Sequence, residues 1–224
     1  MIMVVSQRLY SKLALAKAWC WSHAVTITGA SGCGTSNAIL HLQKLLTQAE
    51  IWRWRFLSGG DIMRRKTVEC GMNKIEDFVA FNRNNPQAGH DRDCDGELAA
   101  FGKGNYVVME SRLSHILAPH AFHVQFICPL EIRAERCRDR YPGKSLDYVR
   151  GVLQQRDADD HARFAAMYPG YDWPCSDFDL VVDTSKIEKQ EVAPLILAKH
   201  AEWLEEKATL GMIVRGATLP AGLS

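Results

Sequence analysis

The sequence predicts an α/β fold in which helices flank a parallel sheet of five strands. Two observations carry this prediction. Short runs of β-branched and apolar residues alternate with longer segments of helical periodicity along most of the chain. A glycine-rich turn at 29–34 joins the first of these runs to the first helical segment. With 224 residues, of which 47% are hydrophobic, the chain is long enough for one domain with a large core.

The first strand and the first helix show the pattern most clearly. Val25 and Ile27 alternate with β-branched threonines, which is typical of a buried strand. Ile39, Leu42 and Leu46 recur at helical spacing and predict a helix with one face in the core. By the same criteria, strands are expected at 24–28, 52–58, 105–110, 122–128 and 180–185. Helices are expected from 37 onward, around 64–65, at 69–81, 92–101, 131–140 and 145–168, and through 196–203.

Composition limits the partners and the compartment. The net charge of +1 argues against a general nucleic-acid binder. The seven cysteines form no C-x-x-C pair, so reduced thiols in the cytoplasm are the simplest interpretation. No apolar run approaches the roughly 18–20 residues that a membrane span requires. We therefore expect a cytoplasmic monomer that binds small molecules and neither nucleic acid nor membrane.

The glycine-rich turn matches the phosphate-binding P-loop template G-x-x-x-x-G-K-[ST] except at one position. Gly29, Gly34 and Ser36 fit, whereas Thr35 occupies the lysine position. The loop's backbone N–H groups would hold phosphate at the helix N-terminus, and the Ser36 hydroxyl would ligate Mg²⁺. A tight glycine turn or a Rossmann-like loop is the alternative. The expected cofactor-binding residues are Gly29, Ala30, Ser31, Gly32, Cys33, Gly34, Thr35 and Ser36.

Charged residues follow the ends of the other predicted strands. Ligands of parallel sheets bind beyond the carboxyl ends of the strands, so these residues should converge on the glycine loop. Glu110 ends the third strand and could lie beside the metal together with Ser36, or it could be a strand-end carboxylate that caps a loop. The arginines are Arg64, Arg112, Arg133, Arg136 and Arg140. Several cations are needed for phosphoryl transfer between two phosphorylated molecules. The run from Arg133 to Arg140 could equally be a solvated helix face with local ion pairs.

Arg156, Asp160 and Arg163 are spaced i, i+4, i+7 and share one helical face. Such a stripe could bind a phosphate together with a polar base. An exposed ladder of ion pairs is the alternative.

The ordered set of motifs over about 24–205 resembles the cytidylate kinases, in particular the short archaeal-type branch. No single motif is specific, but their order is. The segments that carry the resemblance are the glycine loop, Ser58-Gly59-Gly60-Asp61-Ile62-Met63-Arg64, Cys70-Gly71-Met72, Asn85-Pro86 with Asp91 and Asp95, Val107 to Leu113, Pro129 to Arg136, Arg156…Asp160…Arg163, and Asp179 to Lys186.

The resemblance implies a three-layer P-loop NTPase fold and the transfer of a phosphoryl group from ATP to CMP or dCMP, with Mg²⁺. Asp61, Arg64, Arg112 and Arg163 would bind the acceptor monophosphate. Asp160 with Arg156 would recognise the cytosine edge. Arg112, Arg136 and Arg140 would act on the transferring phosphoryl group, the last two from a lid. Members of the archaeal-type branch often carry threonine in the lysine position, as Thr35 does here.

The resemblance also implies a domain organisation. The kinase domain would span 23–208, with a monophosphate-binding insertion at about 58–103 and a short lid at about 138–160. An extension at 1–22 and a disordered tail at 209–224 would lie outside it. Ser111 stands where the family usually has glycine, and Asp159 where longer relatives have arginine. Two other functions therefore stay open: a P-loop kinase for another small phosphorylated or hydroxylated acceptor, and a catalytically weak nucleotide-binding regulatory protein.

Overall fold

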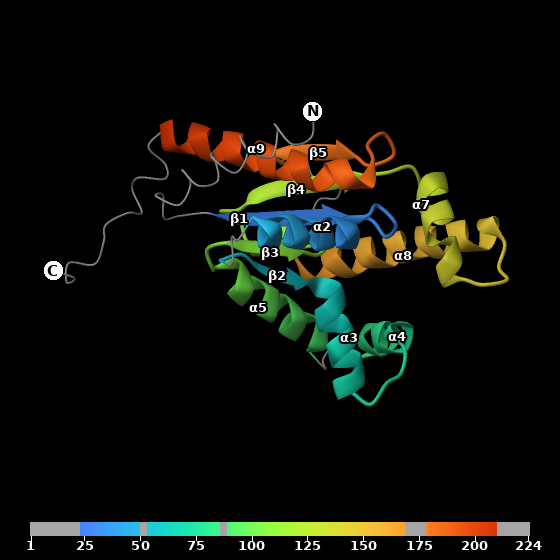
Figure 1. Cartoon of the computed structure of the whole chain (residues 1–224). Coiled ribbons are helices and arrows are strands. Elements are labelled where there is room, and N and C mark those ends of the chain that lie inside the picture. Colours follow the sequence, from blue (N-terminus) through green and yellow to red (C-terminus); the bar gives the residue numbers. More distant parts are fainter. Residues whose placement is uncertain (1–22, 50–52, 86–88, 169–177, 210–224) are drawn as a thin grey trace.

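Five parallel strands form the centre of the molecule in the order β2-β3-β1-β4-β5 (Figure 1). The computed structural model describes residues 23–49, 53–85, 89–168 and 178–209. The strands are β1 (Ala24–Gly29), β2 (Arg55–Ser58), β3 (Val107–Glu110), β4 (Phe122–Ile127) and β5 (Leu180–Asp183). All four pairings are parallel, so the carboxyl ends of the strands share one edge. The predicted α/β fold with a parallel five-stranded sheet is confirmed.

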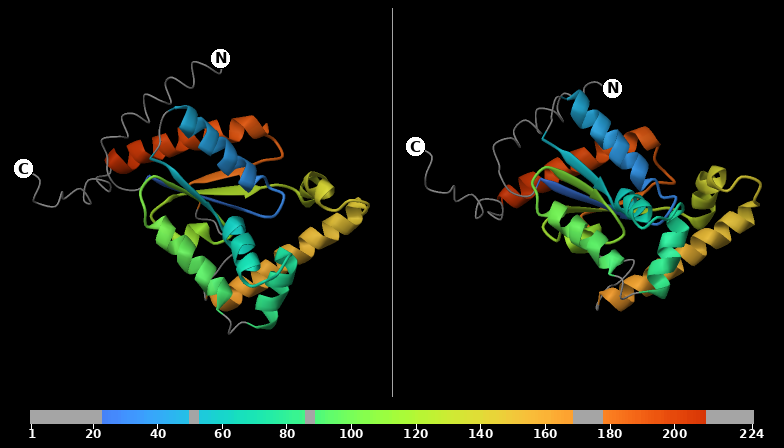
Figure 2. Two further views of the ribbon diagram at one scale, coloured as in Figure 1. Left: turned by 60° about the horizontal axis from the view of Figure 1, so that its bottom comes forward. Right: turned by 90° about the horizontal axis from the view of Figure 1, so that it is seen from below.

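Helices cover both faces of this sheet (Figure 2). They are α2 (Thr35–Gln48), α3 (Gly59–Glu69), α4 (Ile75–Asn84), α5 (His90–Gly102), α6 (Ser114–Leu117), α7 (Leu130–Cys137), the 3₁₀ helix η3 (Arg138–Arg140), α8 (Leu146–Met167) and α9 (Lys189–Thr209). Among the described helices, none is long and apolar enough to cross a membrane.

Alternation along the strands divides the core into two layers. Val25 and Ile27 of β1 pack with α2 and α9 on one face, together with Val108 of β3. Val107 and Met109 of β3 point to the other face, where α3, α5 and α6 cover them. This is the period-2 pattern of a strand buried on both sides, and it explains why most residues of the central strands are apolar or β-branched.

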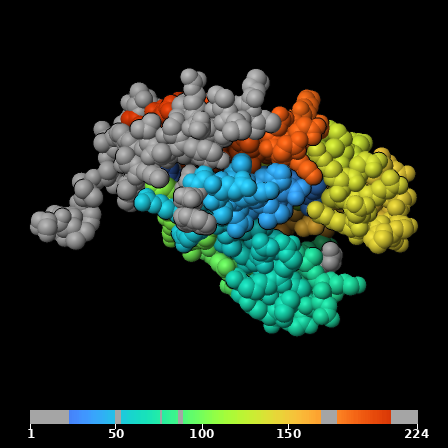
Figure 3. Space-filling view, viewed as in Figure 1, coloured from blue at the N-terminus to red at the C-terminus, as the bar shows by residue number. Residues whose placement is uncertain are grey.

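Two lobes project from the carboxyl edge of the sheet (Figure 3). We call α3 and α4 the inner lobe, and α7, η3 and the first half of α8 the outer lobe. The outer lobe has a small core of its own, in which Ala134 and Cys137 pack on Val149 and Leu153. A notch separates the two lobes in the space-filling view. The arrangement leaves the strand ends open between them.

The structure corrects several expected boundaries. A single helix at 69–81 is wrong, because α3 ends at Glu69 and α4 begins only at Ile75. Gly71 has φ +72, its N–H donates to the carbonyl of Val68, and the N–H of Met72 donates to the carbonyl of Thr67. These two bonds form a Schellman motif, which ends a helix at a left-handed glycine. The helix at 131–140 likewise ends at Cys137 and continues as η3, and α6 was not expected.

The expected extension at 1–22 lies outside the described residues, as does nearly all of the tail expected at 209–224.

Candidate active site

The carboxyl ends of the strands enclose one large cavity of about 1350 Å³. Its walls come from the glycine loop after β1, the inner lobe, the turn after β3, the outer lobe and the loop after β5. All but one of the sequence-predicted site residues line it: Gly29 to Ser36, Arg64, Glu110, Arg112, Arg136, Arg140, Arg156, Asp160 and Arg163. The exception is Asp61, whose carboxylate lies 2.5 Å from Arg64 in an exposed pair. The structure therefore brings residues from five separate segments to a single site.

The glycine loop has the backbone of an anion cradle. Gly32 and Gly34 have φ values of +88 and +93, which favour glycine. Gly34 is also the N-cap of α2, and no side chain caps that helix. The first N–H groups of α2 therefore need an acceptor, and the helix N-terminus carries partial positive charge. Phosphate oxygens match both features.

The thiol in this loop is not set up as a nucleophile. Cys33 is buried, and burial raises the pKa of its thiol to about 11. At neutral pH the side chain is therefore the protonated, unreactive form. Its role in the loop is packing, since it belongs to the main core cluster.

Glu110 is fixed by two hydroxyl groups from different elements. Thr35 Oγ1 donates to Glu110 Oε1 at 2.7 Å, and Ser58 Oγ donates to Glu110 Oε2 at 2.6 Å. Ser58 also caps α3 by accepting from the N–H of Gly60. Thr35, the residue in the lysine position, thus points to the carboxylate and is 8% exposed. Ser36, the expected metal partner of Glu110, is exposed and lines the same cavity.

Arg112 lies at the centre of a group of ion pairs. Its Nη2 is 3.1 Å from Asp160 Oδ2 and 3.3 Å from Asp157 Oδ1. Arg163 pairs with Asp160 at 2.9 Å and with Asp91 of α5 at 3.2 Å. The side chains of Arg112 and Asp160 are only 17% and 14% exposed. Asp160 and Arg163 of the predicted stripe on α8 therefore form a partly buried network that faces the cavity, whereas Arg156 lines the cavity with an exposed side chain.

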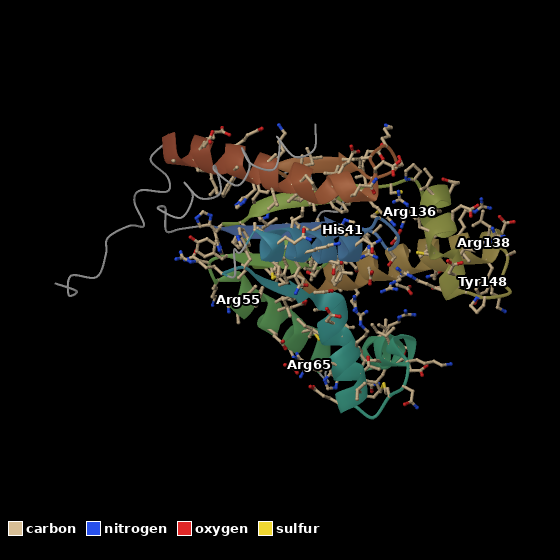
Figure 4. All side chains as sticks on the ribbon, viewed as in Figure 1. His41, Arg55, Arg65, Arg136, Arg138 and Tyr148 are labelled. Carbon is tan, nitrogen blue, oxygen red and sulfur yellow. The ribbon has the colours of Figure 1, made fainter. Side chains whose placement is uncertain are left out.

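Arg136 and Arg140 line the outer-lobe side of the cavity. Arg136 donates to the carbonyl of Thr184 at 2.7 Å and to its hydroxyl at 3.1 Å. That residue follows β5, so Arg136 links the outer lobe to the sheet. Figure 4 shows Arg136 on the sheet side of α7, whereas Arg138 lies toward the outside of the lobe. The segment formed by α7 and η3 is therefore not simply a solvated face.

Sequence reasoning missed Asp157 and did not separate Arg133 from its neighbours. Arg133 is buried and pairs with Asp157 at 2.7 Å. A signal for Asp157 existed, because it precedes Asp160 by three residues and so shares its helix face. A second missed contact is the hydrogen bond from Tyr168 to Asp95, where burial raises the pKa of the carboxyl.

No metal-binding group of three or more His, Cys, Asp or Glu side chains occurs among the described residues. A divalent cation here would therefore rely on Glu110, hydroxyl groups and the oxygens of a bound substrate. Mg²⁺ is typically held in that way in sites that bind nucleoside phosphates.

Two archaeal proteins that are similar to this chain carry the same name. No protein-family model matches the chain. A protein from Methanopyrus kandleri named cytidylate kinase is 28% identical over 201 residues, which cover 83% of this chain and 97% of that protein. A cytidylate kinase from Methanocaldococcus jannaschii is 28% identical over 177 residues, 77% of this chain and 94% of the relative.

Among solved structures, a gluconokinase from Sinorhizobium meliloti 1021 matches with a TM-score of 0.51 and 14% identity. The match covers 84% of this chain and 96% of the other. At that identity the similarity shows a shared fold only. The match supports the α/β architecture of a parallel five-stranded sheet flanked by helices.

Proposed function

We propose that this chain, a member of the cytidylate kinase family, transfers the γ-phosphoryl group of ATP to CMP or dCMP. The observation that carries the proposal is the single cavity that joins the glycine loop to the Arg112–Asp160–Arg163 network. The loop suits a polyphosphate, and the network offers cations beside a carboxylate that can bind a polar base. Two nucleotides can therefore meet with their phosphates facing each other.

The residues at the donor end fit ATP with Mg²⁺. The N-terminus of α2 and the left-handed glycines offer backbone N–H groups to the phosphates. Glu110, already held by Thr35 and Ser58, and the exposed Ser36 supply hard oxygen ligands of the kind Mg²⁺ prefers. A bound Mg²⁺ would be held by Glu110 and Ser36 and would neutralise part of the charge of the ATP phosphates.

The acceptor end would bind the monophosphate through Arg64, Arg112 and Arg163. Asp160, with Arg156 one helical turn away, would accept hydrogen bonds from the cytosine amino edge. Both Asp160 oxygens now form ion pairs with arginines, Oδ2 with Arg112 at 3.1 Å and Oδ1 with Arg163 at 2.9 Å. Acceptor binding therefore exchanges part of this ion-pair network for contacts with the nucleotide.

The two lobes would close on the substrates. The insertion at about 58–103 carries Arg64, and the lid at about 138–160 carries Arg140 and Arg156. Closure would exclude water, so that the acceptor phosphate and not water attacks the γ-phosphorus of ATP. Hydrolysis of ATP is thereby suppressed. The acceptor is already an anion, so no general base is needed. Catalysis then consists of positioning and charge neutralisation by Arg112, Arg136 and Arg140.

A coupled assay for ADP release tests the proposal with CMP, dCMP, UMP and AMP as acceptors. We expect turnover with CMP and dCMP, and weaker turnover with UMP, because uracil carries a carbonyl oxygen where cytosine carries the amino group that would donate to Asp160. Turnover with AMP but not CMP would contradict the role of Asp160. ATP binding without turnover of any acceptor would favour the regulatory alternative. Preference for a different small acceptor would retain the fold and change the substrate.

Replacing Thr35 by lysine should not raise kcat. A lysine at 35 would lie beside Glu110 and form an ion pair with it, which removes the hydroxyl bond and engages the carboxylate. We expect kcat at saturating ATP and CMP to fall, whereas Thr35→Ser, which keeps the hydroxyl, should stay near the wild-type value. A gain of about a hundredfold, equal to about 2.7 kcal/mol of barrier, would show instead that the natural loop is degenerate.

The proposal includes a cytoplasmic monomer with small-molecule partners only. The described cysteines 33, 70, 94, 128 and 137 are free, in keeping with a reducing compartment.

A further inference from the structure

We propose that Asp157 is a positioning residue that couples the acceptor site to the ATP-binding loop. Asp157 holds Arg133 against the loop through one ion pair. Through a second ion pair it contacts Arg112, the arginine assigned to the acceptor phosphate. We call Arg112, Asp157, Arg133 and Ser31 the arginine bridge. The inference rests on the proposed function, because it assumes that the loop binds ATP and that Arg112 binds the acceptor.

The first half of the bridge supports the glycine loop from behind. Arg133 Nη1 donates to Asp157 Oδ2 at 2.7 Å and to the carbonyl oxygen of Ser31 at 3.2 Å. The Arg133 side chain is 9% exposed and does not line the cavity. A guanidinium buried to this extent needs a nearby carboxylate. Asp157 therefore keeps Arg133 in place, and Arg133 keeps the Ser31 carbonyl turned toward α7.

The packing at Gly32 shows how closely α7 approaches the loop. A Cβ atom at Gly32 would lie 2.9 Å from both the Cβ and the carbonyl oxygen of Arg133. The loop therefore rests directly on the backbone of the residue that holds the Ser31 carbonyl. A displacement of Arg133 would therefore also displace the loop, because the backbones of α7 and the loop are already in close contact.

The second half of the bridge reaches the acceptor arginine. Arg112 Nη2 lies 3.3 Å from Asp157 Oδ1 and 3.3 Å from Ser31 Oγ. Ser31 thus contacts both arginines, Arg133 through its carbonyl and Arg112 through its hydroxyl. The charges of Asp157 and Asp160 compete with an incoming phosphate for Arg112. When a phosphate binds Arg112, the ion pair between Arg112 and Asp157 is weakened, and Asp157 then pairs mainly with Arg133.

Opposite effects on the two substrates follow from this geometry. An amide at 157 removes a competing negative charge from Arg112, so the acceptor phosphate should bind more tightly. The same change deprives Arg133 of its carboxylate, so the Ser31 carbonyl is held less firmly and ATP should bind more weakly. A merely structural role would reduce the active fraction without moving the two affinities apart.

The test compares Asp157→Asn with the wild type by calorimetric titration of MgATP and of CMP, each alone, and by steady-state kinetics. We expect Kd and KM for ATP to rise and those for CMP to fall, each about fivefold, a typical coupling between sites. Asp147→Asn is the matched control, because Asp147 lies on the same helix, is 80% exposed and pairs only locally with Arg150 at 2.6 Å. Changes in the same direction for both substrates, or none, would overturn the proposal.

A second variant, Arg133→Lys, separates the two halves of the bridge. Lysine keeps the charge but lacks the planar fork that reaches both Ser31 and Asp157. We expect ATP to bind more weakly and CMP to bind as in the wild type. Unchanged ATP affinity in a variant with wild-type circular dichroism and thermal midpoint would refute the bridge.

Failure of the bridge and failure of the proposed function give different results. If the wild type binds ATP and CMP without phosphorylating any acceptor, the function is wrong, and the Kd values of the variants still decide the bridge. If turnover occurs but the variants shift neither Kd, the function stands and the bridge is wrong. If the wild type binds neither nucleotide, both are wrong.

Discussion

Replacement of Arg112 by methionine should lower kcat/KM for CMP by about a thousandfold, the lower range for an arginine that stabilises phosphoryl transfer. Arg112 is 17% exposed and lies between the glycine loop and the acidic side chains of α8. Its loss removes the cation that we propose to lie between the two phosphates. It also leaves Asp157 and Asp160 with less compensating charge, which would repel the acceptor.

The comparison for this variant is Arg138→Met, which removes one positive charge from η3. Arg138 is 62% exposed, does not line the main cavity and pairs weakly with Glu135 at 3.9 Å. Figure 4 shows it on the outside of the outer lobe. We expect near-wild-type kinetics. Similar losses in both variants would mean that overall charge, and not the position of Arg112, sets the rate.

Replacement of Glu110 by glutamine should lower kcat by about a hundredfold, within the range for groups that ligate or orient a metal. Both Glu110 oxygens accept hydrogen bonds from hydroxyl groups. In glutamine one of these oxygens becomes an NH₂ group, which is itself a donor and cannot accept from the hydroxyl that faces it. It would also remove the negative charge assigned to Mg²⁺. Activity titrated with Mg²⁺ should reach half its maximum at a higher concentration than in the wild type.

Glu135→Gln serves as the matched control, because Glu135 is 54% exposed and does not line the cavity. Its Mg²⁺ titration should superimpose on that of the wild type. An unchanged Mg²⁺ titration in Glu110→Gln, even with reduced kcat, would show that Glu110 positions Thr35 and Ser58 and does not bind metal.

Local patterns predicted most of the secondary structure, but they missed α6 and the break between α3 and α4. The alternation of Val25 and Ile27 and the stripe at Ile39, Leu42 and Leu46 placed the first strand and helix correctly. The helix break near Gly71 was missed, because a Schellman motif depends on a single left-handed residue inside an otherwise helical pattern.

The sequence by itself determined the parallel α/β fold, the glycine loop and most of the charged residues that line the cavity, although it placed Asp61 there wrongly and missed the role of Asp157. Parallel strands with short loops necessarily bring their carboxyl ends to one edge, so Arg112 and Arg136 could be placed near the loop from spacing alone. Only the tertiary structure decided which side chains pair there. Thr35 rather than Ser36 donates to Glu110, and Asp157 rather than Asp160 holds Arg133. Such pairings join residues 75 and 24 positions apart, and their geometry depends on how each helix packs rather than on any local periodicity.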